Sequence, residues 1–446
     1  MQCFLIRLLC IAEKQDHDKG FLHFTVENVR IYLLVLRLPM LSNIKNLRNV
    51  TTKQVKLKNK AIAIALLVLA AVIYNEFSVY DIQKLKWSVQ ECSECVKVLI
   101  VADPQILGEK NENYFGSWLA QWDSDKYLEK TFSRALDHSD PHVVVFLGDL
   151  MDEGHVAGAE SFKSYKRRLD SIFQMPDHIM KIYIPGDNDI GGEEDAVSSN
   201  INNRFNFAYS QPDTLVYKTV TFFKVNRLTH TMPEAPKDAF LNDYAERNTT
   251  NVVLSHMPLL FMPGTFVQNV LKELSPQIIF TAHKHKAMHI SLDTATDQLS
   301  EIWVLPPYET PLYRLRMDVG DIHELQIPTC SYRMGTPHTG YGLVYIDTQE
   351  KVVEFTILWL PGRFPQLWLY VFVGIFILAF SICTCISSYC IKGHAAYNHL
   401  KYDNLTSEVR YKDPSTVSDS VSSFEWKKNN VIVIRRFARK FTYYQT

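Results

Sequence analysis

The longest uncharged stretch of the sequence limits what the rest of the chain can fold into. Residues 367–391 (LWLYVFVGIFILAFSICTCISSYCI) carry no charged side chain. A helix needs about 20 apolar residues to cross the hydrocarbon core of a bilayer. We therefore predict a transmembrane helix at residues 367–391, which anchors whatever precedes it to a membrane.

A second apolar stretch begins with AIAIALLVLAAVIY at residues 61–74. It is short for a membrane span, but Lys58 and Lys60 can extend their side chains to the interface, and residues 77–80 add length. We predict a transmembrane helix at residues 61–80. The alternatives are a buried core helix and a signal anchor that is cleaved.

Flanking charge gives the orientation. Residues 41–60 contain six basic side chains and no acid, whereas Glu76 and Asp81 follow the first apolar stretch. The positive-inside rule then places residues 1–60 in the cytosol. Two spans return residues 392–446 to the cytosol as a polar, largely disordered tail, and they leave a lumenal or extracellular domain at residues 96–358.

The domain between the two stretches has an alternating pattern of strands and helices. Helices are predicted at residues 125–138 and 158–174. Short apolar runs predict strands at residues 97–102, 142–147, 181–184, 251–255, 277–282, 301–305, 342–347 and 352–358. This pattern indicates an α/β architecture. The chain has 47 Lys and Arg against 48 Asp and Glu, so no basic field favours nucleic acid as a partner.

Each of the first five predicted strands ends in residues that can bind a metal ion. In chain order these are Asp103; Asp149 and Asp152; Asp187, Asn188 and Asp189; His256; and His283 and His285. The carboxyl ends of strands in α/β sheets meet at one crevice, so the side chains can converge. Oxygen and imidazole ligands suit Mn²⁺, Fe or Zn²⁺, and two ions sharing a carboxylate commonly cleave phosphoesters.

The order of these motifs resembles that of the calcineurin-like metallophosphoesterases. The sequences DPQ at Asp103, FLGDLMDEG around Asp149 and PGDNDIGG around Asp187 resemble most the membrane-anchored metallophosphoesterase 1 family within that superfamily. The resemblance covers about residues 96–350 and implies a sandwich of two mixed sheets flanked by helices. It also implies two divalent metal ions, with Mn²⁺ as the expected metal.

The resemblance assigns a ligand set to each ion. The first ion would be held by Asp103, Asp149, His285 and Gln105, and the second by Asp149, Asp187, His256 and His283. A metal-bridging hydroxide would attack phosphorus in line. Gln105 stands where the superfamily has a histidine, and Asp187 stands where it has asparagine. Both changes favour a harder ion such as Mn²⁺ or Mg²⁺.

Asn188 is the largest departure from the superfamily pattern. It replaces the histidine that protonates the leaving oxygen, and the loss of a positioned general acid costs about 10²- to 10⁴-fold in rate. Asp189 then has no imidazole to orient, and Asp152 would orient a ligand or a bound water. Three other histidines are candidate proton donors, namely His155, His289 and His338.

By resemblance, the expected substrate is a lipid-linked phosphodiester, with ethanolamine phosphate on the GPI-anchor glycan as the leading case. The expected location is the ER or Golgi membrane. The alternative is a metal-binding pseudoenzyme that recognises glycans or cargo, which Asn188 favours. Tyr397 with Leu400 and Tyr402 with Leu405 form tetrapeptides that resemble sorting signals read by adaptors. The sequon at Asn248 is consistent with a lumenal glycoprotein.

Two further features have more than one interpretation. The Cys92 and Cys95 pair could form a disulfide with Cys330, or with each other. In the segment at residues 115–132, Trp118 and Trp122 with Asp123 and Asp125 could face a glycan. The other interpretation is that the two tryptophans bury one face of a helix.

Overall fold

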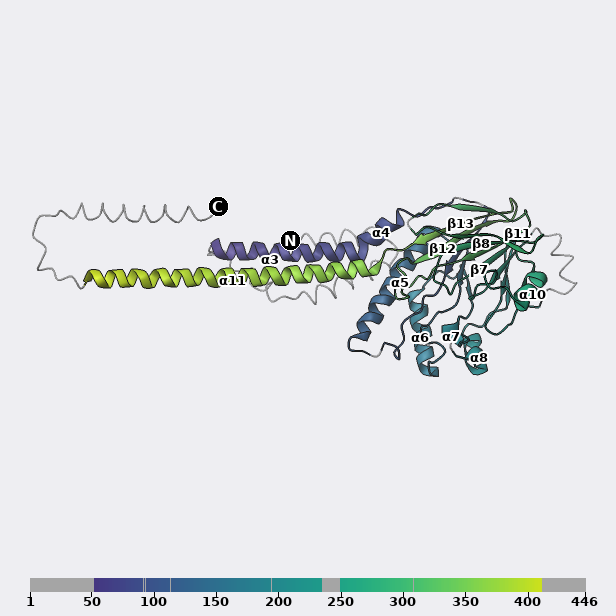
Figure 1. The fold of residues 1–446 in the computed structure, drawn as a ribbon, viewed down its shortest axis with the longest axis horizontal. Helices are drawn as coiled ribbons and strands as arrows, with labels where there is room; N and C mark the ends of the chain where they lie inside the picture. The colour runs from purple at the N-terminus through teal and green to yellow at the C-terminus, as the bar shows by residue number, and fades with distance from the viewer. Residues whose placement is uncertain are drawn as a thin grey trace, which may run out of the picture. The chain divides into compact units, whose positions relative to one another are not determined.

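The computed structural model describes residues 52–90, 92, 94–112, 114–193, 195–234, 249–307 and 309–410. Asn248 of the sequon lies outside these residues. The chain divides into two compact units, Met1–Tyr370 and Val371–Thr446. The first unit contains the α/β domain, whose sheets and covering helices are drawn in Figure 1.

Six strands form the first sheet, in the order β10-β13-β12-β1-β2-β3. Their bounds are β1 (Val96–Val101), β2 (Val143–Phe146), β3 (Met180–Tyr183), β10 (Tyr313–Arg316), β12 (Gly340–Asp347) and β13 (Val352–Trp359). Strands β1, β2 and β3 are parallel, with Val98 opposite Val143 and Val143 opposite Met180. Their carboxyl ends therefore lie at the same edge of the sheet.

Seven strands form the second sheet, in the order β4-β5-β6-β7-β11-β8-β9. Their bounds are β4 (Thr214–Tyr217), β5 (Val220–Lys224), β6 (Thr250–Leu254), β7 (Ile278–Thr281), β8 (Met288–Asp293), β9 (Gln298–Val304) and β11 (Asp321–Gln326). Strands β5, β6, β7 and β11 are parallel, and the other pairs are antiparallel. The fold class is therefore α/β with two mixed sheets, as predicted.

The alternation of side chains along the strands builds the layers. Val98 and Ile100 of β1 point into a core shared with strands of the second sheet, whereas Leu99 and Val101 pack with residues of the helices. Helices α5 (Ser117–Ser139) and α6 (Ala159–Ile172) supply that outer layer, and α10 (Thr265–Leu274) packs on the second sheet. Strands buried on both faces explain the continuous apolar runs in the sequence.

The eight predicted strands are present, with ends shifted by up to three residues. Strands β4, β5, β8, β10 and β11 were not predicted, nor were α7 (Asp187–Ile190), α8 (Ser199–Ala208) and α10. β11 reads DIHELQ, which has no apolar run, yet five of its six residues are buried. Its neighbours in the sheet, rather than its own hydrophobicity, make it a strand.

Two helical stretches are long and apolar enough to cross a membrane. They are Asn59–Lys84, with a mean hydropathy of 2.1, and Arg363–Cys390, with a mean hydropathy of 2.6. Only 17% of the first window is buried, unlike the core helix of a soluble protein. The first stretch comprises α3 (Thr52–Ile73), the π-helical turn η2 (Tyr74–Ser78) and α4 (Val79–Lys84).

The end of the first stretch belongs to the α/β domain rather than to an apolar span. Glu76 and Tyr80 are buried, and Glu76 contacts Arg363 and Lys130. Tyr80 of the segment predicted to lengthen the span therefore packs on the domain, although residues 77–80 lie within the candidate span Asn59–Lys84.

Helix α11 (Arg363–Arg410) continues far beyond the predicted end of the second span. Of the tail at residues 392–446, which was predicted to be largely disordered, residues 392–410 are helical. The sequence of this part has no proline and only one glycine, so nothing interrupts the helix. Tyr397 and Tyr402 lie on it with exposed side chains, and residues 411–446 lie outside the described part.

Cys92 and Cys95 form a disulfide with each other. Cys330 is a free thiol and fully buried, so the pairing of Cys330 with either of them is wrong. Its backbone nitrogen donates a hydrogen bond to Ala102 at the end of β1, which places the thiol inside the core. Burial raises the pKa of the Cys330 thiol.

Candidate metal centre

The loops after the strands use an unusual backbone conformation. Five of the seven predicted metal ligands have φ in the left-handed region, namely Asp103, Gln105, Asp149, His283 and His285. This conformation costs free energy for residues other than glycine, and it is concentrated at functional sites. It turns each side chain back across the strand ends toward a common point.

The structure brings the predicted ligands together. His256 Nε2 lies 2.9 Å from Asp187 Oδ1 and 3.5 Å from Asp149 Oδ1. His283 Nδ1 lies 3.1 Å from Asp187 Oδ1. On the other side of the cluster, His256 Nδ1 and His285 Nε2 lie 3.8 Å and 3.9 Å from Asp103 Oδ1.

These side chains form two groups able to hold a metal ion. One consists of Asp187, His256 and His283, and the other of Asp103, Asp149 and His256; within each group the ligand atoms lie within 4.8 Å of one another. Their assignment to particular ions stays a prediction.

The carboxylate of Asp103 shows what the cluster lacks. Asp103 is fully buried, and neither of its oxygens has a hydrogen-bond partner among the described residues. A buried carboxylate without a partner costs several kcal/mol. A divalent cation supplies the missing charge, so the residues fit a metal ion.

Burial and the neighbouring charges shift the pKa values of side chains in the cluster. Burial opposes a charge on His256, but Asp149 and Asp187 raise its pKa to about 10. Asp187 is partly buried, which opposes its charge, yet hydrogen bonds with His256 and His283 lower its pKa. Burial and the neighbouring imidazoles lower the pKa of His285 to about 4, so its ring is neutral and able to bind a metal.

Backbone groups around the cluster hold the ligands in place. His256 Nδ1 lies 2.7 Å from the carbonyl oxygen of Leu147, which leaves Nε2 facing the carboxylates. Gly148 and Gly186 allow the loops to approach. A Cβ on Gly148 would lie 2.8 Å from His256 Nδ1, and one on Gly186 would overlap Asp149.

Gln105 and Asn188 both contact the central carboxylate. The side-chain amide of Gln105 donates to Asp149 Oδ2 at 2.8 Å and lies 3.4 Å from His285 Nε2. The side-chain amide of Asn188 donates to Asp149 Oδ2 at 3.0 Å, and its backbone N–H donates to Asp149 Oδ1 at 2.9 Å. Asn188 thus lies at the cluster and orients Asp149, but an amide cannot act as a proton donor of the imidazole kind.

Asp189 connects two loops rather than orienting a catalytic group. Its buried carboxylate accepts hydrogen bonds from the backbone N–H groups of Gly186, Leu150 and Met151, at 3.0 to 3.1 Å. Burial and the charge of Asp149 raise the pKa of Asp189 to about 7. Its contacts fix the loop of Asp149 against the loop of Asp187.

Asp152 is not brought to the cluster by any contact among the described residues. Its carboxylate accepts a hydrogen bond from Asn111, at 3.2 Å. The next residue, Glu153, is fully buried and accepts from backbone N–H groups of the β1–α5 loop. Because one residue along a turn changes the direction of the side chain, the acid that faces inward is Glu153.

The three candidate proton donors lie in different places. His155 Nδ1 is 3.1 Å from the carbonyl oxygen of Asn188, and its Nε2 is 3.6 Å from Asp195. His289 is buried against His323, at 3.2 Å between ring nitrogens, and His338 lies beside Trp359. Among the contacts given above, only that of His155 reaches a residue of the site, Asn188.

The buried-face interpretation of the tryptophan segment is wrong, and the glycan interpretation fails for its two acids. Trp118 is 69% exposed and Trp122 is 39% exposed, so they do not bury a helix face. Asp123 is buried and binds Arg363 and Tyr332, so it does not face a glycan. Asp125 pairs with Arg168. The helix packs on the domain through a face rotated from the one expected.

Two acids near the cluster were not found from the sequence. Glu193 Oε1 lies 3.5 Å from His283 Nε2, and Glu324 accepts hydrogen bonds from Thr281 and from the loop after His256. Glu193 follows two glycines in a polar loop, and Glu324 lies in an unpredicted strand, so neither had a local signal.

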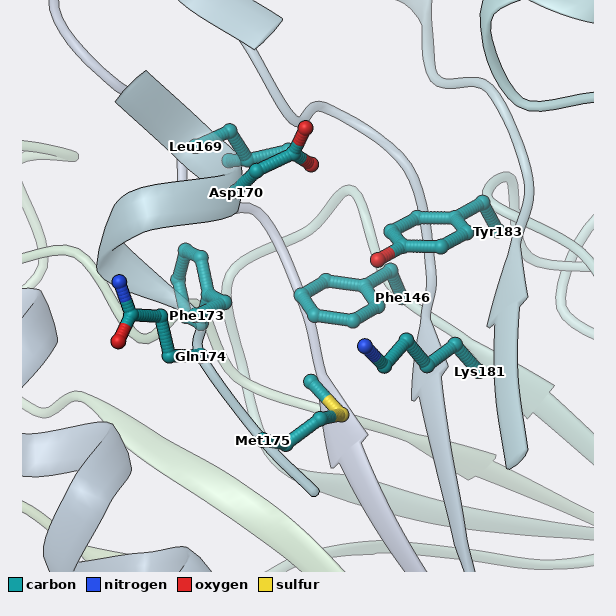
Figure 2. Close-up of a pocket in the computed structure, with 8 residues that line it drawn as sticks. All are labelled: Phe146, Leu169, Asp170, Phe173, Gln174, Met175, Lys181 and Tyr183. Atoms are coloured by element: carbon teal, nitrogen blue, oxygen red, sulfur yellow. The ribbon is translucent and has the colours of Figure 1, made fainter. Parts of the chain in front are cut away.

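A pocket of about 470 Å³ lies on the other side of the first sheet, under α6 (Figure 2). Its lining includes Phe146, Phe173 and Tyr183 together with Asp170 and Lys181, and no metal-cluster residue lines it. The pocket is therefore separate from the strand-end site.

Comparison with known proteins agrees with the site. Residues 96–287 match the family model of calcineurin-like phosphoesterases. This range contains all seven residues predicted as metal ligands. Residues 96–287 are therefore similar to the calcineurin-like phosphoesterases, and this domain supports a metal-dependent phosphoesterase.

The relatives that carry a name are metallophosphoesterase 1 proteins. The chain is 27% identical to the metallophosphoesterase 1 homologue of Caenorhabditis elegans over 73% of this chain and 92% of that protein. It is 29% identical to metallophosphoesterase 1 of Ailuropoda melanoleuca, over 36% of this chain and 42% of that protein. A solved metallophosphoesterase from Sphaerobacter thermophilus aligns at 11% identity and a TM-score of 0.29, over 59% of this chain and 88% of that one. The named relatives support the metallophosphoesterase 1 family.

Proposed function

We propose that this chain is a membrane-anchored, two-metal phosphodiesterase of the secretory pathway. The leading substrate is ethanolamine phosphate on the glycan of a GPI anchor, and the leading metal is Mn²⁺. The observation that carries the chemistry is the fully buried carboxylate of Asp103, which has no hydrogen-bond partner among the described residues and lies with two further acids and three imidazoles. Bound divalent ions would supply the nucleophile and neutralise charge on the phosphoryl oxygens.

The position of the domain supports a lipid-linked substrate. Residues at both of its ends continue into helices that are long and apolar enough to cross a membrane. The two connections meet where Arg363 Nη2 contacts Glu76 Oε1 at 3.1 Å. A site tied to a membrane by both ends stays near substrates whose lipid part remains in the bilayer. In this proposal the domain is lumenal, in the ER or Golgi, and the helical tail carries the adaptor motifs at Tyr397 and Tyr402.

His155 is the proton donor of this proposal. Its backbone N–H donates to the Asn188 carbonyl at 2.8 Å, which holds the ring beside the position that lacks the usual imidazole. Its Nδ1 lies 3.1 Å from the carbonyl oxygen of Asn188, and its Nε2 lies 3.6 Å from Asp195. Replacing His155 by Gln should lower kcat by about 10²-fold, whereas the exposed His178→Gln control should not.

The test of the substrate compares glycans on GPI-linked proteins from cells with and without the chain. We expect more ethanolamine phosphate on the glycans of cells that lack it. Equal content would exclude this substrate. Hydrolysis of a generic phosphodiester by the purified full chain with Mn²⁺ tests the chemistry separately.

The second candidate function is a metal-binding protein without turnover. Asn188 favours it, because its amide donates to Asp149 where a general acid is expected. Full metal stoichiometry in the parent chain, together with no hydrolysis of any phosphodiester in the parent or in Asp149→Asn, would support this function.

A further inference from the structure

The first turns of α5 expose a group of large apolar side chains. Phe115 is fully exposed, Trp118 is 69% exposed, Leu119 is 50% exposed and Trp122 is 39% exposed. Trp118 and Trp122 are four residues apart, so they share one side of the helix. We call these four residues the α5 aromatic face. Side chains of this size are rarely grouped on a surface that meets only water.

The direction of α5 places this face relative to the apolar helices. Three ion pairs connect α5 to the segment that follows α3. From one pair to the next, the residue numbers of both partners increase. The pairs are Glu76 with Lys130, Asp81 with Arg134, and Lys84 with Asp137. Helix α5 therefore runs parallel to η2 and α4, and Figure 1 shows it next to α4. Its N-terminal end points back toward the side from which α3 enters the domain.

The distance along α5 between Lys130 and Trp118 shows how far the α5 aromatic face lies from Glu76. Lys130 is level with Glu76, and Trp118 lies twelve residues earlier in the same helix. At 1.5 Å per residue this is about 18 Å along the helix axis. Even when α5 is inclined to α3, Trp118 lies beyond Glu76 in the direction of the apolar residues of α3.

The start of the second apolar helix lies at the same level. Arg363, the first residue of α11, contacts Asp123 of α5 at 2.5 Å, one residue from Trp122. The next residue, Phe364, is 51% exposed and its ring contacts Tyr332. The α5 aromatic face is therefore continuous with the place where α11 begins.

We propose that the α5 aromatic face lies in the headgroup region of the membrane that the two apolar helices cross. Tryptophan is enriched at this depth, and phenylalanine and leucine supply apolar area that enters the acyl boundary. The contact is a third attachment of the domain, besides the two helices, and it fixes the tilt of the domain. It rests on the membrane anchoring in the proposed function but not on the catalytic chemistry.

The experiment measures tryptophan emission from the full chain in lipid nanodiscs, with ordinary or brominated phosphatidylcholine. Bromine quenches only tryptophans that contact lipid. In the parent chain Trp118, Trp122 and Trp368 of α11 should be quenched. The double variant W118F/W122F removes two of these three, so the quenchable emission should fall clearly below that of the parent.

Two controls separate lipid contact from exposure. Trp303→Phe removes a tryptophan that is 42% exposed on β9, and it should leave the quenchable emission unchanged. Phe207 on α8 is 88% exposed, and the tryptophan of Phe207→Trp should stay unquenched. Both substitutions keep an aromatic side chain, so the fold is retained.

Three results would overturn the proposal. Equal quenching of the parent and of W118F/W122F would show that the face does not touch lipid. Emission that responds to a soluble GPI glycan but not to brominated lipid would assign the face to sugar. Absence of quenching of Trp368 would remove the membrane anchor as well, while metal-dependent hydrolysis in detergent would still report on the catalytic proposal.

Discussion

Two clusters of buried acids in this molecule differ in what neutralises them. In the metal centre, Asp103, Asp149 and Asp187 face only imidazoles and amides. In the Arg363 cluster, Glu76 and Asp123 contact Arg363, and Glu76 also contacts Lys130. The second cluster contains two acids and two permanent cations, so it is neutral by itself. The first contains three acids and no lysine or arginine among its described contacts, so a divalent ion can supply its positive charge, and this difference separates a binding site from a structural one.

The largest expected effect is on catalysis. Asp149→Asn keeps the shape of the central side chain but removes its negative charge. That charge lies beside both candidate metal groups. Hydrolysis of a phosphodiester by the full chain with Mn²⁺ should fall by about 10⁴-fold, because metal ions supply several kcal/mol of transition-state stabilisation. Asp123→Asn, in the other cluster, should keep the activity of the folded fraction. Equal losses in the two variants would contradict the comparison.

The next effect is on stability. Arg363→Met leaves Glu76 and Asp123 buried without their shared cation, which costs about 3 to 5 kcal/mol. Thermal unfolding of the full chain in detergent should show a large loss. Arg316→Met breaks an exposed pair with Asp318 and should change the unfolding temperature little. The double variant R363M/D123L should recover part of the loss, and no recovery would mean that charge pairing is not the cause.

A third buried cluster, formed by His289 and His323, extends the comparison, because its described contacts include two imidazoles and no acid. Burial, with the neighbouring His323, lowers the pKa of His289 to about 4. The unfolded chain takes up this proton near pH 6.5, so the folded state loses stability as pH falls from about 6.5 to about 4. The contribution is up to about 3 kcal/mol. Unfolding of His289→Gln should be less sensitive to pH in this window than that of the parent, whereas His178→Gln should match the parent.

The smallest effect tests the close approach of the loops. A methyl group at Gly186 would overlap Asp149, so Gly186→Ala must shift the loop that carries Asp187. Mn²⁺ affinity, measured by calorimetry on the full chain, should fall by about 10- to 100-fold. Gly158→Ala is the matched control, since a Cβ there meets nothing within 4 Å. An equal change in both variants would mean that the packing of Gly186 does not position the ligands.

Much of the fold was predictable because its central strands are buried on both faces. Strands such as β1 and β2 read as apolar runs that end in a ligand, which is a local signal. β11 reads DIHELQ, and its burial comes from β7 and β8 on either side. No local pattern shows such a strand, and Glu324, which supports the site, is missed with it.

The ligand types, their order along the chain and the apolar stretches can all be read from the amino-acid sequence, because strand burial and ligand type depend on consecutive residues. Which side chains face inward depends on the packing of distant segments. Glu153 rather than Asp152 is buried, Asp123 turns to Arg363, and Trp118 turns outward. The disulfide joins Cys92 to Cys95, and Cys330 stays a buried free thiol. The direction of a side chain depends on what its helix or turn packs against, and those partners lie up to 240 residues away.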